Sequence, residues 1–423
     1  MGISIRPFRT VCAWLACAAL AHPVAADTTP AAWRLGDAIA DRSASPAAVA
    51  TFHIDVLSAE DLRAADTLLL PLPEGPLEAT LIARTDRGAE NFTWLGRHAA
   101  DDDPTVILTV VSGALSGLVY AHQHVYELTS LADGRSVLLL LDQDRFPPCD
   151  GGIDPARQDL HGHPVETAGA TPMTGDLEVD VLVLYTRQAR DGAGGTSQIA
   201  STAQAAVDAA NVAFLNSRMV TRFRTVGIEL WDVDETSLGA NSSQRLGALR
   251  TSAWVQSRRD ALGADLVGLL VNDGQGGCGI GYVMRTPAAS FASWAFQVTA
   301  RNCAVGNLTY AHEHGHNMGF EHDPANGTSP GNASFPWSFG HFHDSGTSQQ
   351  RFRTVMSYST PCDGSCPRRA YFSNPEVLYQ GERTGIGGER DNARSGDLVY
   401  DIVRLFRTRV KQDAIFADDF EAG

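Results

Sequence analysis

Positive charge, cysteine and long hydrophobic runs are all scarce in this chain of 423 residues. Lysine and arginine together number 33 against 49 aspartate and glutamate residues, which gives a formal net charge of -16. Because no basic run could follow a phosphate backbone, we expect no nucleic-acid partner. Beyond the amino-terminal end, no uncharged apolar segment reaches the roughly 20 residues that span a bilayer, so we expect no stable membrane anchor.

The amino-terminal end has the features of an export signal. Two arginines precede an apolar stretch over residues 11–21, and the small residues Val24-Ala25-Ala26 follow. This order predicts a signal peptide, residues 1–26, that is cleaved before Asp27 and directs the chain through the periplasm to the medium. A lipid anchor on Cys17 is the alternative, which would leave an abbreviated apolar core.

One segment places three histidines and a carboxylate at spacings that a single metal ion can use. On a helix, His312 and His316 lie at i and i+4 and therefore on one face, with Glu313 beside that face. Gly319 can adopt the positive φ that ends a helix, so that the chain turns back and His322 returns as a third ligand. Three protein ligands leave the fourth position of the metal open.

This set of donors is typical of zinc. Neutral imidazoles suit Zn2+, and three protein ligands with one open position indicate a catalytic site rather than a closed structural one. The alternative is a polar helix that is merely rich in histidine. A chain of this composition would show the five fixed positions by chance roughly once in ten thousand sequences, so we favour one catalytic zinc ion. The sequence leaves calcium binding open.

The same segment resembles a known family signature. The pattern H-E-x-x-H-x-x-G-x-x-H followed by Asp323 is similar to that of the metzincin zinc metalloproteases, and the aspartate resembles their reprolysin or adamalysin branch, here in a bacterial secreted form. Metzincins also carry a methionine in a tight turn beneath the metal. Met356, in Thr354-Val355-Met356-Ser357-Tyr358, lies about thirty residues downstream, as in that family. The resemblance covers residues 177–410.

The resemblance implies a role for each of these residues. The three histidines would bind zinc, and Glu313 would act as general base toward a metal-activated water. Met356 would form a hydrophobic floor and would not be a ligand. Tyr358 stands where some branches have a tyrosine that approaches the transition state, and simple packing is the alternative for it.

The cysteine count leaves one thiol without a partner. Export removes two of the seven cysteines with the signal and leaves an odd number in an oxidising compartment: Cys149, Cys278, Cys303, Cys362 and Cys366. The simplest arrangement pairs Cys278 with Cys303 and Cys362 with Cys366, although the sequence leaves the other two connectivities open. Cys149 is then left over.

Cys149 lies in a proline-flanked segment, Pro147-Pro148-Cys149-Asp150-Gly151, ahead of the expected catalytic part. A thiolate there could occupy the open zinc position and keep the enzyme latent. Such a device resembles the cysteine switch of several metzincin propeptides, although the surrounding residues match it only in part. A buried unpaired cysteine and a disulfide to another chain are the alternatives.

The chain divides into two folded parts and two terminal segments. We expect a signal peptide (1–26), a β-rich propeptide domain with a linker (27–175), a zinc metalloprotease catalytic domain (176–410) and a carboxy-terminal tail (411–423). In the propeptide, short apolar runs bounded by Gly, Asp and Ser predict three strands, at 105–111, 117–120 and 137–141.

The catalytic part predicts an α/β (α+β) metzincin-like fold with a mixed sheet and an active-site helix. Its first apolar run is typical of a strand buried on both faces. Strands and helices then alternate before the histidine-bearing helix: strands at 179–186, 222–231 and 264–271, helices at 197–216 and 242–262. The first helix should bury one stripe, carried by Ile199, Ala203, Ala206, Ala210 and Phe214.

The segment before the metal helix should hold the edge strand over the cleft and its neighbour. Ile280 and Tyr282 alternate there, and Trp294, Phe296 and Val298 do the same. A free edge could receive an extended peptide through main-chain hydrogen bonds. A merely structural hairpin is the alternative.

Together these patterns predict a secreted zinc-dependent endopeptidase, made as a latent precursor, that hydrolyses peptide bonds of protein or peptide substrates. The alternative is a zinc-bearing adhesion or binding module of metzincin fold without turnover. Glu313 favours the enzyme, because a binding module needs no base beside its ligands. The sequence leaves open the cleavage preference, the processing site and the oligomeric state.

Overall fold

The computed structural model describes residues 29–40, 44–88, 90–99, 103–121, 123–155 and 178–410. The expected signal peptide at 1–26, most of the expected linker from Pro147 to Asp176 and the tail at 411–423 therefore lie outside the described residues. Within the described ranges, no helix has both the length and the apolar character needed to cross a bilayer.

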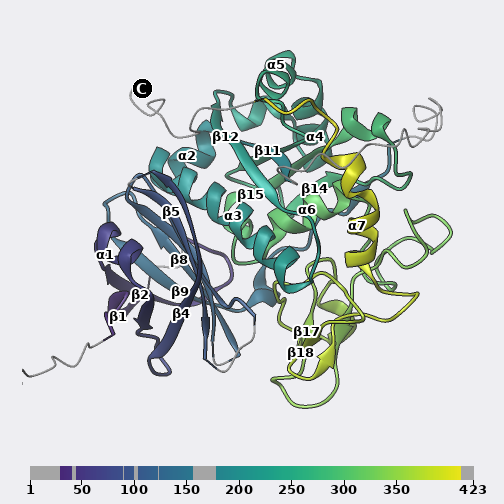
Figure 1. The fold of residues 1–423 in the computed structure, drawn as a ribbon. Coiled ribbons are helices and arrows are strands. Elements are labelled where there is room, and N and C mark those ends of the chain that lie inside the picture. Colours follow the sequence, from purple (N-terminus) through teal and green to yellow (C-terminus); the bar gives the residue numbers. More distant parts are fainter. Residues whose placement is uncertain are drawn as a thin grey trace, which may run out of the picture.

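The amino-terminal part folds as one nine-stranded antiparallel sheet, which carries the purple and blue colours in Figure 1. Its order is β1-β2-β9-β8-β7-β6-β5-β4-β3, and the short helix α1 (Ala59–Ala64) joins β2 to β3. The three strands expected from the apolar runs correspond to β6, β7 and β9. The strands are β1 (Trp33–Ile39), β2 (Ala48–Val56), β3 (Thr67–Leu70), β4 (Leu77–Gly88), β5 (Asn91–His98), β6 (Val106–Val111), β7 (Ala114–Ala121), β8 (His124–Ser130) and β9 (Ser136–Leu141).

The second part is built on a six-stranded mixed sheet of order β10-β14-β15-β13-β11-β12. Neighbouring strands are parallel except for β14 and β15, which pair antiparallel. The strands are β10 (Gly152–Ile153), β11 (Val179–Thr186), β12 (Phe223–Trp231), β13 (Leu266–Val271), β14 (Gly279–Tyr282) and β15 (Phe296–Ala300). Two hairpins follow farther along the chain: β16 (Phe342–His343) with β17 (Phe352–Arg353), and β18 (Leu378–Tyr379) with β19 (Glu382–Arg383). The expected mixed α/β architecture is confirmed.

Helices cover this sheet, and one of them carries the histidine motif (Figure 1). The helices are α2 (Arg187–Ala193), α3 (Thr196–Asn216), α4 (Ser242–Thr251), α5 (Ala253–Leu262), α6 (Thr309–Asn317) and α7 (Asn392–Val403). The expected strand 179–186 coincides with β11, and the expected helix 197–216 begins one residue earlier, as α3.

Two details of the expected element order are wrong. The single helix predicted at 242–262 is two helices, because Ser252 adopts an extended ψ of 121° and its hydroxyl caps the second helix at Val255 N, 3.3 Å away. Trp294 does not lie on a strand. It ends a 3-10 helix, and β15 begins at Phe296.

Helix α3 is buried on more than the one stripe that was expected. The five stripe residues are buried, and so are Ser201, Asp208 and Val212 on the opposite side. The helix contacts β12 and α6 of its own domain and also β6 and β7 of the nine-stranded sheet. Figure 1 shows it running between the two sheets. The many alanine side chains of α3 suit this place because they let both sheets approach the helix closely.

Asp208 on α3 is the main polar contact between the two parts. From the nine-stranded sheet, Arg87 donates to it at 2.8 Å, Thr93 at 2.5 Å and Thr109 at 2.8 Å. Gln204, one turn earlier on α3, donates at 3.0 Å. A buried carboxylate with four donors is fully compensated, and this fixes where the nine-stranded sheet sits on the helix.

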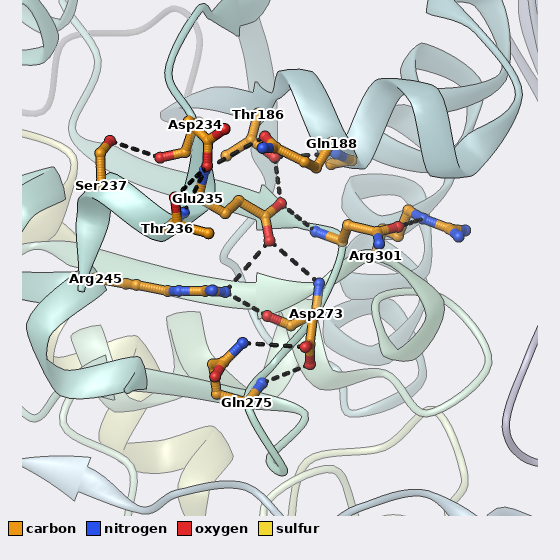
Figure 2. Close-up of polar contacts among 12 residues, drawn as sticks. Thr186, Gln188, Asp234, Glu235, Thr236, Ser237, Arg245, Asp273, Gln275 and Arg301 are labelled. Carbon is orange, nitrogen blue, oxygen red and sulfur yellow. Dashed lines mark hydrogen bonds and ion pairs between the residues drawn. The ribbon is translucent and has the colours of Figure 1, made fainter. Parts of the chain in front are cut away.

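A second buried carboxylate, Glu235, organises the carboxyl end of the parallel strands (Figure 2). It accepts hydrogen bonds from Thr186 Oγ1 at 2.5 Å and from the backbone N–H of Asn272 at 2.6 Å. Arg245 of α4 pairs with it at 3.4 Å and donates to the carbonyl oxygen of Asp273. These contacts tie the ends of β11 and β13 to α4, so this cluster serves the fold.

Glu127 of β8 lies buried against the second part of the chain. A Cβ added at Gly306 would lie 2.4 Å from Glu127 Oε2, so the two parts meet closely there. Burial raises the pKa of Glu127 to about 8, although Gly306 N–H and the Arg301 charge act in the opposite direction. The folded chain therefore binds this proton more tightly than the unfolded chain.

We expect Glu127→Gln to reduce the loss of stability at alkaline pH. A carboxyl whose folded pKa is raised from 4.5 to about 8 contributes stability below pH 4.5, and this contribution is lost as pH rises through about 8. The thermal unfolding midpoint should therefore fall less in the variant than in the parent between about pH 4 and about pH 9, which bracket this window. Equal falls would contradict the assignment.

Candidate active site

Helix α6 presents the histidine motif, and Gly319 ends it as the sequence indicates. Gly319 has a φ of 81°, its N–H donates to His316 O, and Phe320 N–H donates to Gly315 O, each at 2.9 Å. This is the Schellman arrangement of a helix terminus. It reverses the chain so that His322 comes back beside the helix.

The three expected ligands converge on one point. His322 Nε2 lies 3.1 Å from His312 Nε2 and 3.0 Å from His316 Nε2. Each of the three side chains is buried, and the donor atoms lie close enough together to hold one metal ion. The sequence prediction that these histidines come together is therefore correct in geometry.

The other ring nitrogen of each histidine is fixed by a backbone carbonyl. His312 Nδ1 donates to Val355 O at 2.8 Å, His316 Nδ1 to Phe320 O at 2.8 Å, and His322 Nδ1 to Asn326 O at 3.3 Å. These bonds place the proton on Nδ1 and leave a lone pair on each Nε2. Three lone pairs that point at one another repel, and a cation among them removes the repulsion. The residues therefore fit a metal.

Burial also keeps these imidazoles neutral. It lowers the pKa of His316 to about 4 and of His322 to about 3, and it lowers that of His312 well below its ordinary value. Neutral imidazole is the form that binds a metal, so the site is ready for one at neutral pH without losing protons.

Glu313 of α6 lies beside this cluster, and its side chain packs against β14. It is completely buried, and neither carboxylate oxygen has a hydrogen-bond partner among the described residues. Burial raises its pKa to about 8. The strand approaches so closely that a Cβ at Gly279 would lie 2.8 Å from Glu313 Cγ, and one at Gly281 would lie 2.8 Å from Glu313 O. Glycine at both positions allows this contact.

Met356 lies beneath the helix where the resemblance to metzincins places it. A Cβ added at Gly315 would lie 2.6 Å from the Met356 sulfur, so the thioether packs directly against the helix between the two histidines. The side chain is completely buried. It forms an apolar support.

Comparison with known proteins bears on this arrangement. Residues 176–373 match the reprolysin-type family described as metallo-peptidase family M12. A peptidyl-Asp metalloendopeptidase of Xanthomonas campestris is 30% identical over 295 residues, which cover 69% of this chain and 67% of the relative. One of Stenotrophomonas maltophilia is 31% identical over 308 residues and covers 69% of each.

The chain belongs to the reprolysin-like M12 metallopeptidases. It is a zinc metalloendopeptidase, as the family and these relatives indicate. Among solved structures, metalloproteinase-II of Bacteroides fragilis matches with a TM-score of 0.38 and 10% identity, over 64% of this chain and 85% of that one.

Asp323 of this metallopeptidase joins the third histidine to the methionine turn. Its carboxylate accepts hydrogen bonds from Tyr358 N at 3.0 Å, Ser357 Oγ at 3.2 Å and Asn326 Nδ2 at 2.9 Å. The sequence marked Asp323 only as a family signature. Its physical role is to hold the segment after His322 against the turn below the metal position.

Tyr358 lies over the histidine cluster. Its ring centroid is 4.3 Å from that of His322, and its hydroxyl donates to the carbonyl oxygen of Cys149 at 3.2 Å. The side chain therefore packs on His322 and also hydrogen-bonds the segment that contains Cys149.

The thiol of Cys149 is in the active site of this metallopeptidase. Cys149 is buried and free, and its sulfur lies within 4.8 Å of His312 and Glu313 donor atoms. Burial raises the pKa of the thiol well above its ordinary value, and the neighbouring Glu313 charge acts in the same direction.

The residues around Cys149 occupy the edge of the catalytic sheet. Cys278 N–H donates to Pro148 O, and Asp150 N–H donates to Gly279 O, both at 2.9 Å. Strand β10 then pairs with β14 in parallel, so the expected edge strand is not free in this structure. A two-residue strand carries no sequence signal, because it forms only against its partner.

The other four cysteines of the described residues form disulfides, and His314 lies outside the histidine cluster. Disulfides join Cys278 to Cys303 and Cys362 to Cys366, which confirms the simplest pairing. His314 points away from the metal position: it bonds Asn317 Oδ1 at 3.0 Å and packs on Tyr310.

We expect zinc to raise the thermal unfolding midpoint of the chelator-treated protein by several degrees, because a ligand that binds only the folded state stabilises it, by about 2.7 kcal/mol at a hundredfold excess over Kd. His316→Ala should remove most of this shift, since it deletes one of three converging donors. His314→Gln is the matched control, a buried histidine on the same helix outside the cluster. A full zinc shift in His316→Ala would contradict the ligand assignment.

Proposed function

We propose that this chain is the precursor of a secreted zinc endopeptidase whose own amino-terminal part keeps it latent. His312, His316 and His322 bind one zinc ion, and Glu313 is the general base. The observation that carries the proposal is the convergence of three neutral imidazoles beside a buried, unpartnered carboxyl group. The proposal leaves calcium and the oligomeric state open.

The chemistry follows from the surroundings of Glu313. When bound, zinc supplies Lewis-acid polarisation of the scissile carbonyl group and lowers the pKa of water. The Glu313 carboxylate takes a proton from the attacking water and later gives it to the leaving amine.

Tyr358 is proposed to assist at the transition state. Its hydroxyl now donates to Cys149 O, a peptide carbonyl oxygen that lies in the cleft. Once the segment around Cys149 leaves, a substrate carbonyl can take the same place. The ring contact with His322 keeps the hydroxyl near the metal position.

Substrates are proposed to bind along β14 as an added strand. The backbone of residues 148–153 already uses this edge, with hydrogen bonds at Cys278, Gly279 and Val283. Because main-chain bonds accept any sequence, side-chain subsites must provide the preference. Since the relatives are named peptidyl-Asp metalloendopeptidases, we propose cleavage of peptide bonds next to aspartate.

Latency is proposed to come from Cys149 and the strand that follows it. The thiol approaches Glu313 and His312, where it can supply the fourth zinc ligand and displace water. Strand β10 covers the edge that a substrate needs. Active enzyme therefore requires removal of the amino-terminal part.

The same proposal assigns the regions of the chain. Residues 1–26 are the signal peptide, 27–175 the propeptide domain with its linker, 176–410 the catalytic domain and 411–423 a tail. The nine-stranded sheet supports the second assignment, because it packs on α3 through Asp208 and places Cys149 in the cleft. A zinc-binding module without turnover is the competing function. The effect of replacing Glu313 on turnover distinguishes the two.

We expect Glu313→Gln to reduce kcat of the processed enzyme by about 10²- to 10⁴-fold, because the amide cannot accept the proton. The zinc-induced rise in unfolding temperature should persist, since the three imidazoles are unchanged. Cleavage of casein and of peptide libraries would be followed by mass spectrometry. If processed, zinc-loaded parent protein cleaves none of several substrates, the binding module is the better assignment.

We expect Cys149→Ser to raise the initial peptidase activity of the uncut chain on the order of tenfold, the effect of about 1.4 kcal/mol less stabilisation of the closed state. Activity would be measured before any cut appears on a gel. Asp150→Asn is the matched control, a neighbour whose backbone contact is retained. Unchanged latency in Cys149→Ser would exclude the thiol as the switch.

A further inference from the structure

Two buried arginines lie behind the turn that carries Met356. Arg353 and Arg368 are each 3% exposed, and they face each other across a short parallel bridge. Both donate to the carbonyl oxygen of Ser357, Arg353 Nη1 at 3.1 Å and Arg368 Nη2 at 3.2 Å. Ser357 lies between Met356 and Tyr358, so the two guanidinium groups adjoin the floor of the metal site.

The two cations lack a carboxylate partner within the described ranges. Two further donors reach carbonyl oxygens. Arg353 Nε donates to Cys366 O at 3.1 Å, and Arg368 Nη1 donates to Asn307 O at 2.7 Å. Arg368 Nε is buried and has no hydrogen-bond partner. Two adjacent buried cations cost free energy unless anions compensate them, and a spare donor in such a place suits a ligand.

The acidic groups that face this pair, carboxyl groups and one thiol, come from two sources. Asp323 and Glu313 belong to the catalytic part, and they already serve the methionine turn and the base. Asp144 and Cys149 belong to the amino-terminal part. Removal of that part therefore takes away Asp144, the carboxylate that faces Arg353 from the amino-terminal part.

The amino-terminal segment touches the arginines and the loop around them directly. Arg368 N–H donates to Gln143 Oε1 at 2.6 Å, across 225 residues of sequence. Asp144 is exposed, and a Cβ added at Gly364 would lie 3.2 Å from its Oδ2. The segment thus crosses the arginine pair before Cys149 reaches Glu313.

We propose that Arg353 and Arg368 form the subsite that recognises the acidic side chain next to the cleaved bond, and that Asp144 faces Arg353 until the amino-terminal part leaves. This inference rests on the proposed peptidase function and on its preference for aspartate. The planar guanidinium group matches a carboxylate in geometry and stays charged when buried, which a lysine does less well. An asparagine of the same shape leaves the cations uncompensated and is rejected.

The test compares peptides that differ only by Asp, Asn or Ala, placed on either side of the scissile bond. We expect processed parent enzyme to favour Asp over Asn by about 10- to 100-fold in kcat/KM. Arg353→Gln and Arg368→Gln should bring this ratio to within about threefold, through a loss on the Asp peptide alone. The matched control is Arg259→Gln, a buried arginine that binds the carbonyl oxygens of Ala264 and Ala292 away from the site, and it should keep the ratio.

A second arm uses the exposed residue Asp144 in the full chain, where a folding defect is not expected. Asp144→Asn should raise the initial activity of the uncut chain by roughly threefold or more, because a neutral side chain compensates the arginines less. Asp133→Asn is the control and should leave latency unchanged, because Asp133 is an exposed aspartate in the turn between β8 and β9 and pairs with Arg135.

The outcomes separate the two proposals. A parent enzyme that cleaves no peptide overturns the proposed function, and with it the subsite. A parent that prefers Asp, with variants that keep this preference, overturns the subsite alone. A parent that cleaves Asp and Asn peptides equally also overturns it. If the arginine variants fail to fold, the Asp144 arm decides, and unchanged latency in Asp144→Asn then counts against the subsite.

Discussion

Three imidazole lone pairs that meet in a buried space repel one another. The contacts around His322 hold the three rings together against this repulsion. Backbone carbonyl oxygens accept the Nδ1 protons of the three histidines, and these hydrogen bonds orient the Nε2 atoms toward one another. Gly319 reverses the chain, Gly315 lets the Met356 sulfur approach, and Asp323 ties the segment after His322 to the methionine turn. Each of these contacts preserves an arrangement that is unfavourable by itself and favourable around a cation.

A second feature is that the amino-terminal part contacts the catalytic part at several places and not at a single residue. Asp208 fixes the nine-stranded sheet on α3, Gln143 touches Arg368, and Cys149 enters the cleft beside Glu313. Because α3 also packs on α6, the helix that bears the ligands is braced from both parts. The proposed latency therefore depends on a broad interface as well as on one thiol.

Much of this could be predicted where a local pattern carries the information. The histidine spacing, the turn at Gly319 and the buried strand β11 all follow from periodicity that neighbouring residues enforce. The break at Ser252 was missed because both flanking segments favour helix and only a cap separates them. Burial of the second face of α3 depends on strands some hundred residues away. Arg353 and Arg368 were missed because single arginines have no motif, and only the fold brings them together.

The parallel pairing of β10 with β14 has a kinetic consequence in the proposed precursor. While the chain is continuous, the segment that blocks the edge is present at a high effective concentration, which dilution cannot lower. A single cut between Ile153 and Val179 changes the order of this reaction, because rebinding of the blocking segment then becomes bimolecular. Activation would follow secretion into a large volume, whereas the same cut in a confined compartment would leave the enzyme largely covered.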